Sequence, residues 1–131
     1  MKYLLDSHTF LWFVVDAPEL SSKAKSLLLN SENQIWVSIA SFWEISIKNS
    51  LGKLRLEVGY QGLLEEANKN EFEILPIGFE HTVLLNGLDF HHRDPFDRMI
   101  IAQAITENMN IVGVDQVFDA YLNQQSIQRI W

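Results

Sequence analysis

Short blocks of hydrophobic and polar residues alternate along the chain and predict strands and helices in turn. Four apolar runs have the length of buried strands and a fifth segment is a weaker candidate; they cover residues 3–5, 34–37, 72–75, 111–114 and 126–130. Between them, caps, helical periodicity and terminating glycines predict helices. These helices cover residues 10–15, 22–29 (with Ser21 or Ser22 as cap), 39 to about 51, 60–70, 79–86 and 95 to about 108.

This order of elements predicts the fold class. Strands that alternate with helices favour an α/β layered fold with a mainly parallel sheet of about five short strands. At 131 residues, the chain is expected to form a single domain over residues 1–131. Parallel strands place their carboxyl ends at one edge, where ligands bind in open sheets of this kind. The residues just past the strand ends are therefore the first candidates for function.

The segment 91–104 is the most informative stretch of the sequence. Asp94 is a good N-cap, and Pro95 then falls at the first helical position, where its missing N–H costs nothing. Asp97 lies in the first turn, which favours a carboxylate, but it shares a helical face with Ile101 and Ala104. A carboxylate at the head of an apolar stripe needs a partner that compensates its charge.

Three further acids occupy positions where a cleft is expected. Asp6 follows the first predicted strand, and Asp115 follows the fourth. Glu44 lies in the helix after the second strand, which begins at the same edge. The position of Asp97 stays open, because its helix leads into the fourth strand and is expected to start near the opposite edge or beside the sheet.

Each acid also has a purely structural interpretation. Asp6 or Asp115 can form a turn, Asp94 is more typical of a cap than of a ligand, and Glu44 can pair with Lys48 one helical turn away. Together, however, several carboxylates in one cleft repel one another unless a cation is bound. Oxygen ligands in a chain without cysteine select a hard ion, Mg²⁺ or Mn²⁺.

Composition narrows the functional class. The net charge of −7 repels nucleic acid on average, so binding to it must be local or metal-assisted, and an acidic surface also suits a basic protein partner. The absence of cysteine excludes a thiolate zinc site and fits a reducing compartment. The N-terminal apolar run is interrupted by Asp6 and His8, which predicts a cytoplasmic protein without a membrane span. None of the four histidines forms a His-x-x-x-His pair, so a zinc site is not expected.

Four motifs in order resemble those of a PIN-domain ribonuclease, of the VapC toxin type found in bacterial toxin–antitoxin pairs. They are Asp6-Ser7-His8-Thr9, the segment 38–45 around Glu44, Arg93-Asp94-Pro95-Phe96-Asp97-Arg98 with the segment 101–104, and Val114-Asp115 with Phe118. The resemblance covers nearly the whole chain and implies a three-layer α/β/α fold. It also implies an RNA substrate, a homodimer and a cognate basic antitoxin.

The resemblance assigns roles to individual residues. It implies that an acidic quartet holds Mg²⁺ or Mn²⁺ and cleaves RNA phosphodiesters; the quartet is Asp6, Glu44, Asp97 and Asp115. Ser7 and Thr9 are candidates for orienting a ligand, and Asp94 matches a subgroup pattern. Lys48, Arg93 and Arg98 are candidates for phosphate contacts or for ion pairs with the acids. Gly113-Val114 stands where many relatives have Asn or Thr before the last acid. The aromatic run 10–15 is a candidate dimer surface.

Two other classes stay open from the sequence. One is a Mg²⁺-dependent phosphatase or phosphotransferase with Asp6 as nucleophile. Such enzymes usually carry a second aspartate two residues later, and here that position is His8. The other is a non-catalytic subunit whose acids receive a basic partner.

Overall fold

The computed structural model describes residues 1–131, which form seven helices and five strands. The strands are β1 (Lys2–Leu5), β2 (Gln34–Ser38), β3 (Glu73–Leu75), β4 (Asn110–Val112) and β5 (Arg129–Ile130). The helices are α1 (Ser7–Val14), α2 (Ser22–Leu29), α3 (Ile39–Ser50), α4 (Gly59–Lys69), α5 (Phe79–Asn86), α6 (Pro95–Glu107) and α7 (Val117–Leu122). No helix has both the length and the apolar character that crossing a membrane requires.

All five strands lie in one parallel sheet, in the order β3-β2-β1-β4-β5. The register aligns Leu5 with Val37 on one side and with Val112 on the other. The next residues along the chain are Asp6, Ser38 and Gly113, so all three lie side by side at the carboxyl edge of the sheet. The predicted parallel sheet and its edge are confirmed.

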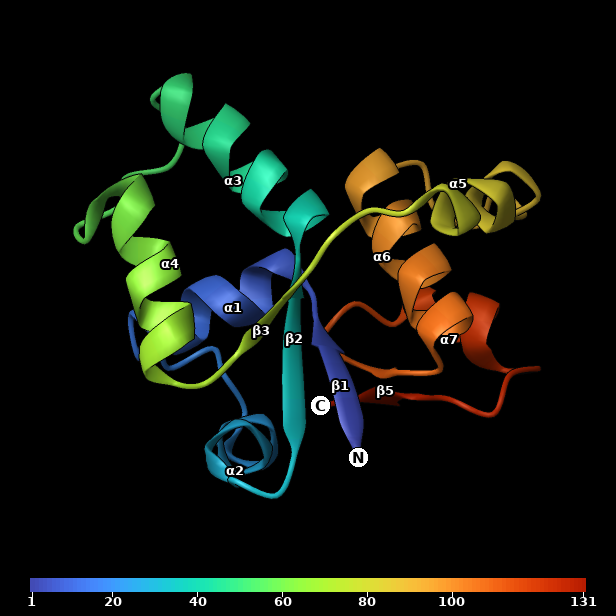
Figure 1. Cartoon of the computed structure of the whole chain (residues 1–131), viewed down its shortest axis with the longest axis horizontal. Coiled ribbons are helices and arrows are strands. Elements are labelled where there is room, and N and C mark those ends of the chain that lie inside the picture. The colour runs from blue at the N-terminus through green and yellow to red at the C-terminus, as the bar shows by residue number, and fades with distance from the viewer.

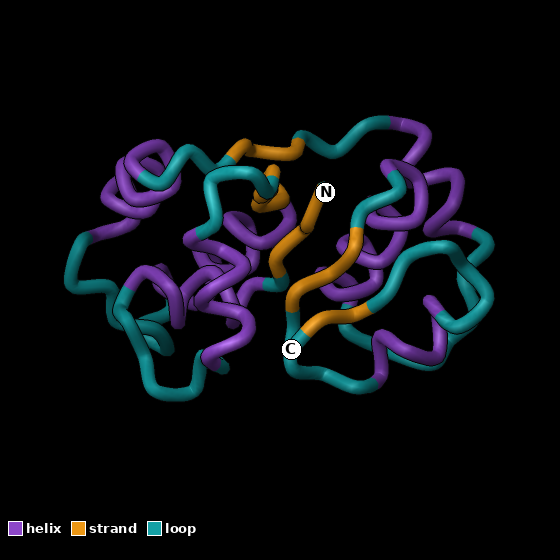
Figure 2. Tube along the Cα trace, turned by 90° about the horizontal axis from the view of Figure 1, so that it is seen from below, coloured by secondary structure: helices purple, strands orange, loops and turns teal.

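Helices cover both faces of the sheet and give the predicted three layers (Figure 1). Alternation along β1 divides the core, because Tyr3 and Leu5 belong to one buried cluster and Leu4 to the other. The first cluster includes residues of α1 to α4, and the second includes residues of α6 and α7, with α5 packed on α6. Seen from below, the strands run between the two groups of helices (Figure 2).

The structure corrects the sequence prediction at the ends of β1 and β4. Helix α1 begins at Ser7 rather than at Phe10, because the Asp6 side chain accepts a hydrogen bond from the Thr9 amide and caps the helix. Strand β4 ends at Val112, two residues early, and the short helix α7 was not predicted. Helix α7 has only six residues, too few for a clear helical period.

The aromatic run 10–15 contributes in part to the core: Phe10 is buried, residues 11–14 are partly buried and Val15 is exposed. The rings of Phe10 and Phe42 lie 5.4 Å apart, and those of Phe13 and Phe72 lie 5.2 Å apart. Trp12 contacts Trp131 near the C-terminus, 5.8 Å between centroids. Periodicity along one helix could not reveal this burial, because the covering residues come from distant parts of the chain.

The direction of α6 settles the position that the sequence left open for Asp97. The helix ends at Asn108, whose left-handed conformation (φ 56°) turns the chain directly into β4. Helix α6 therefore runs antiparallel to the strands and begins at their carboxyl edge, not at the opposite edge. Buried Gln103 holds the helix there. Its side chain accepts a hydrogen bond from Ser38 Oγ at the end of β2 and donates one to the carbonyl of Pro76, just after β3.

Candidate metal centre

Asp6 lies at the middle of the carboxyl edge and is almost fully buried. Its Oδ1 accepts the Thr9 amide at 2.8 Å, and its own amide donates to the carbonyl of Val112 at 3.1 Å. Thr9 also donates from Oγ1 to the Val112 carbonyl at 3.0 Å. Thr9 thus ties the start of α1 to the end of β4, and the Asp6 carboxylate is held in a fixed orientation between two neighbouring strands.

Gly113 provides the space for the Asp6 carboxylate. A Cβ atom at this position would lie 2.7 Å from Asp6 Oδ2 and 3.2 Å from the Phe118 ring. The glycine is required here by close approach rather than by a positive φ. Gly113, which departs from the pattern implied by the family resemblance, therefore supports Asp6 directly in this chain.

Glu44 is buried in α3, and both of its carboxylate oxygens have partners. Ser7 Oγ donates to Oε1 at 2.7 Å, and Lys48 Nζ donates to Oε2 at 2.9 Å. The predicted pair of Glu44 with Lys48 is confirmed, but it is half-buried rather than a fully exposed surface pair. The hydrogen bond to Glu44 raises the pKa of Lys48, so its ammonium group stays charged beside the acids.

Asp97 and Asp115 meet at the ring of His92. His92 Nε2 lies 3.0 Å from Asp97 Oδ2 and 3.2 Å from Asp115 Oδ2. The other ring nitrogen, Nδ1, accepts the Asp94 amide at 3.1 Å, so the proton of the neutral ring is on Nε2. That N–H donates to Asp115 Oδ2, and Asp97 Oδ2 lies beside the same nitrogen. Asp115 Oδ1 also accepts the Val117 amide at 2.9 Å.

Sequence reasoning assigned no role to His92, although the residue is central to the site. Its backbone amide donates to the Tyr121 hydroxyl at 2.7 Å, which anchors it to α7. The available signal was its place two residues before the cap Asp94, from which its ring can accept the cap amide. The contact with Asp115 joins residues 23 positions apart and is invisible in the local pattern.

Asp94 is the N-cap of α6, as predicted. Its Oδ1 accepts the amides of Phe96 at 2.8 Å and Asp97 at 3.0 Å. The same carboxylate is close enough to act on the charge of Asp97. Asp94 therefore both starts the helix and adds negative charge beside the cluster.

The carboxylates are more crowded than their neighbours can neutralise. Burial is the largest cause that raises the pKa of Asp97 to about 7. The charges of Asp94, Glu44 and Asp6 act in the same direction, and the proximity of His92 opposes them without cancelling them. Burial also raises the pKa of Asp6. Ionised carboxylates at this edge are therefore costly in the protein alone.

The two arginines of the motif lie outside the acid cluster. Arg98 is buried, and its guanidinium donates to the carbonyls of Leu88, Asp89 and His92 and to the Tyr121 hydroxyl. These bonds shape the loop before α6 and engage both terminal nitrogens of the guanidinium. Arg93 is exposed at the same loop.

The donor set fits a hard divalent cation. One carboxylate oxygen each from Asp97 and Asp115 and the His92 nitrogen lie within 4.8 Å of one another. The charges of Asp6 and Glu44 act on Asp97, which places both acids beside this group. His92 Nε2 carries a proton in this arrangement, so the oxygens of the acids are the available ligands.

Comparison with known proteins identifies the family. A sequence model of the PIN domain matches residues 3–121. Among solved structures, VapBC2 from Rickettsia felis, bound to a DNA fragment from its promoter, gives a TM-score of 0.73 at 20% identity, over 100% of this chain and 99% of that one.

Two further VapBC structures share the fold. VapBC-1 from nontypeable Haemophilus influenzae gives a TM-score of 0.70 at 16% identity, over 99% of this chain and 97% of that one. VapBC-5 from Mycobacterium tuberculosis gives a TM-score of 0.65 at 17% identity, over 98% of this chain and 97% of that one. No curated protein shows significant sequence similarity. Because the matched residues span most of the chain, it belongs to the PIN-domain family.

Proposed function

We propose that this protein is a metal-dependent endoribonuclease and acts as the toxin of a toxin–antitoxin pair. One observation carries the proposal: carboxylates from separate elements converge at the carboxyl edge, where burial first and the neighbouring acids second raise the pKa of Asp97 to about 7. A site built only for stability would not gather acids that repel one another. A divalent cation removes the repulsion and supplies the chemistry of phosphodiester hydrolysis.

Asp97, Asp115 and Asp6 would hold the ion, with Glu44 beside them. When bound, Mg²⁺ or Mn²⁺ would supply the activation of water that phosphodiester hydrolysis requires. The chain itself supplies the orientation. His92 lies between Asp97 and Asp115 and donates to Asp115, and the Thr9 amide fixes Asp6.

Lys48 is the cation best placed to meet a phosphate. Its ammonium is half-exposed, one helical turn along α3 from Glu44, and carries a raised pKa. Ser7 keeps the other oxygen of Glu44 engaged, so the Glu44–Lys48 pair keeps a defined geometry at the edge of the site. Arg98 is excluded from this role by its bonds to the loop carbonyls.

The deciding experiment compares RNA cleavage by closely matched variants. Wild type, Asp6→Asn, Asp97→Asn and the control Asp89→Asn are purified identically and incubated with total and transfer RNA in Mg²⁺, Mn²⁺ or EDTA. Asp89 has an exposed side chain in the loop before α6. We expect a few discrete products from wild type and Asp89→Asn, and none with EDTA or from the other two. Equal cleavage by all four would identify a contaminating nuclease and overturn the proposal.

The proposed partner is a basic antitoxin, with the toxin itself a homodimer. The structural neighbours are VapBC and FitAB assemblies, and the net charge of −7 suits a basic partner. Light scattering is expected to give twice the chain mass, and co-expression with the adjacent reading frame is expected to co-purify a small basic protein. A monomer at high micromolar concentration would refute the dimer.

A further inference from the structure

The first turn of α6 sends three consecutive side chains in different directions. Successive helical residues differ by about 100°, and here Phe96 contacts Trp43 of α3, Asp97 joins the acid cluster, and Arg98 enters the loop before the helix. Phe90 lies on that loop against the Arg98 guanidinium. Two exposed aromatic residues, Trp43 and Phe90, therefore contact the two sequence neighbours of Asp97, which are Phe96 and Arg98.

Phe90 is an exposed residue whose ring lies against a buried cation. Its residue is 81% exposed, yet the Arg98 Cζ atom lies 4.0 Å from the ring centroid. The residue Arg98 is only 6% exposed, and its guanidinium donates to the carbonyls of Leu88 and Asp89, just before Phe90. The chain therefore orders this loop around a buried cation while one aromatic ring stays open to solvent.

Trp43 provides a second exposed aromatic side chain, on helix α3. It precedes Glu44 in α3 and is 57% exposed. Its ring meets Phe96 edge to face, with centroids 5.1 Å apart and planes at 85°. Trp43 and Phe96 thus bridge the same two helices that supply Glu44 and Asp97.

We propose that Phe90 and Trp43 are stacking platforms for unpaired nucleobases on either side of the RNA phosphate that meets the acid cluster. The inference rests on the proposed nuclease function and names how the substrate is held. A net charge of −7 gives little attraction for the RNA backbone, so the bases must supply much of the affinity. Stacking on aromatic rings does this without reading sequence.

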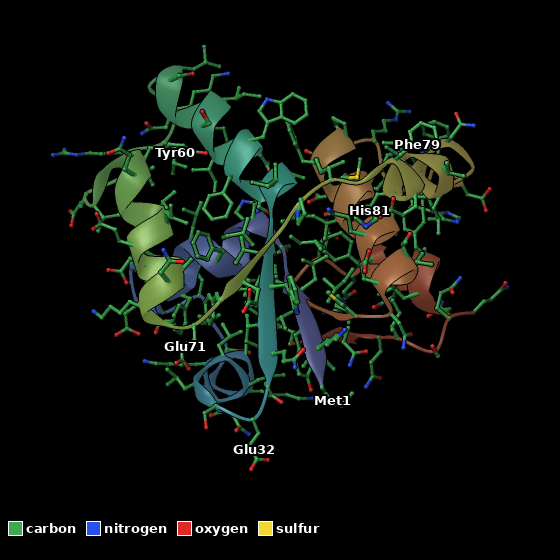
Figure 3. The ribbon with its side chains drawn as sticks, viewed as in Figure 1. Met1, Glu32, Tyr60, Glu71, Phe79 and His81 are labelled. Carbon is green, nitrogen blue, oxygen red and sulfur yellow. The ribbon has the colours of Figure 1, made fainter.

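A leucine substitution separates stacking from a structural role of Phe90. The ring also covers the Arg98 guanidinium, and leucine keeps an apolar cover but has no π-face. Phe79 is the matched control, because it is 82% exposed and lies on α5 (Figure 3). Trp43→Leu removes the second ring, and Trp43→Phe retains an aromatic face. Unchanged thermal unfolding will establish that each variant is folded.

Binding is measured apart from cleavage, in the Asp97→Asn background with Mg²⁺. The probe is a single-stranded RNA of about ten nucleotides, which is long enough to reach both rings. It contains 2-aminopurine, whose fluorescence falls when the base stacks. We expect Phe90→Leu and Trp43→Leu each to weaken binding by about 5- to 150-fold and to reduce the quenching. Phe79→Leu and Trp43→Phe are expected to bind within about twofold of the background protein.

The outcomes distinguish this inference from the proposed function. If wild type cleaves RNA but all variants bind the probe equally, the platforms are refuted and the nuclease stands. If wild type does not cleave, yet Phe90→Leu and Trp43→Leu selectively weaken RNA binding, the platforms are supported and the nuclease is refuted. Absence of both cleavage and binding refutes both. If Phe90→Leu and Trp43→Leu bind RNA as before but retain less of a co-purifying protein, the two rings contact a protein partner and the inference is overturned.

Discussion

At the scale of single residues, Gly113 is expected to tolerate no added methyl group. In Gly113→Ala the new Cβ would press on Asp6 Oδ2 and on the buried Phe118 ring, neither of which is a free end. We expect a loss of about 1–3 kcal/mol in the free energy of unfolding, as for overpacked cores, together with reduced RNA cleavage. Urea unfolding measures the first effect.

Gly87→Ala is the control for this substitution. A Cβ at Gly87 would meet only the Leu84 carbonyl, at 3.8 Å, and the backbone there has a negative φ. The free energy of unfolding of Gly87→Ala should remain within about 0.5 kcal/mol of that of wild type. Equal stability and activity for both glycine variants would show that Asp6 shifts without cost.

His92 is the second residue whose role can be tested alone. In the absence of metal, His92→Ala removes the N–H between Asp97 and Asp115 and should cost about 1.5–3 kcal/mol of stability, as for hydrogen bonds to charged groups. With saturating Mn²⁺ the loss should shrink, because the cation then offsets the repulsion. Thermal melts in EDTA and Mn²⁺ measure this difference. His91→Ala, at the exposed neighbour, should show no such dependence on metal.

At the scale of elements, the start of α6 separates a helix cap from a ligand. Asp94→Ala should lose about 0.5–2 kcal/mol, because the amides of Phe96 and Asp97 lose their acceptor. Asp94→Ser restores an acceptor and should recover most of the stability. Asp97→Asn, in contrast, should abolish cleavage and leave the helix intact. Near-normal cleavage by Asp97→Asn would contradict the assignment.

Helices α6 and α7 differ in how far the local sequence pattern predicts them. The cap Asp94, Pro95 and the apolar stripe predict α6 correctly, because all of these signals act within one or two helical turns. Helix α7 has six residues, and it forms because Phe118 and Tyr121 pack into the second core cluster. Its start is supported by Asp115, which accepts the Val117 amide. Such tertiary support leaves little trace in the sequence.

At the scale of the whole molecule, stability should fall as pH rises in the absence of metal. The folded pKa of Asp97 is about 7, above its ordinary value of 3.8. Between these values the folded protein binds more protons than the unfolded chain, so the free energy of unfolding decreases with rising pH. The expected contribution is on the order of a few kcal/mol.

Urea unfolding in EDTA from about pH 4.5 to 7.5 measures this effect as the difference between wild type and Asp97→Asn. The asparagine variant isolates Asp97 from Asp6, whose pKa is also raised. Wild type should lose more stability than Asp97→Asn across the window, and Mn²⁺ should reduce the difference by binding the ionised form. Parallel pH dependences in EDTA would show that the Asp97 pKa is not raised.

The sequence by itself determined the layered α/β fold, the parallel sheet and the acids at its edge. Strand length and helical period follow from local backbone geometry, so the sequence pattern predicts them. Asp6 and Asp115 were found because a parallel sheet places residues after strand ends together. Glu44 was placed at the same edge because its helix begins there, whereas the assignment of Asp97 to the cluster needed the family resemblance.

Only the tertiary structure decided which groups meet within the cluster. The tertiary structure places the start of α6, and with it Asp97, at the carboxyl edge. It also places His92 between Asp97 and Asp115, and Gly113 against Asp6. These contacts depend on the packing of residues far apart in the chain, where an ångström decides between a hydrogen bond and a gap. Periodicity carries no information at that precision, so the chain specifies these contacts only through the complete fold.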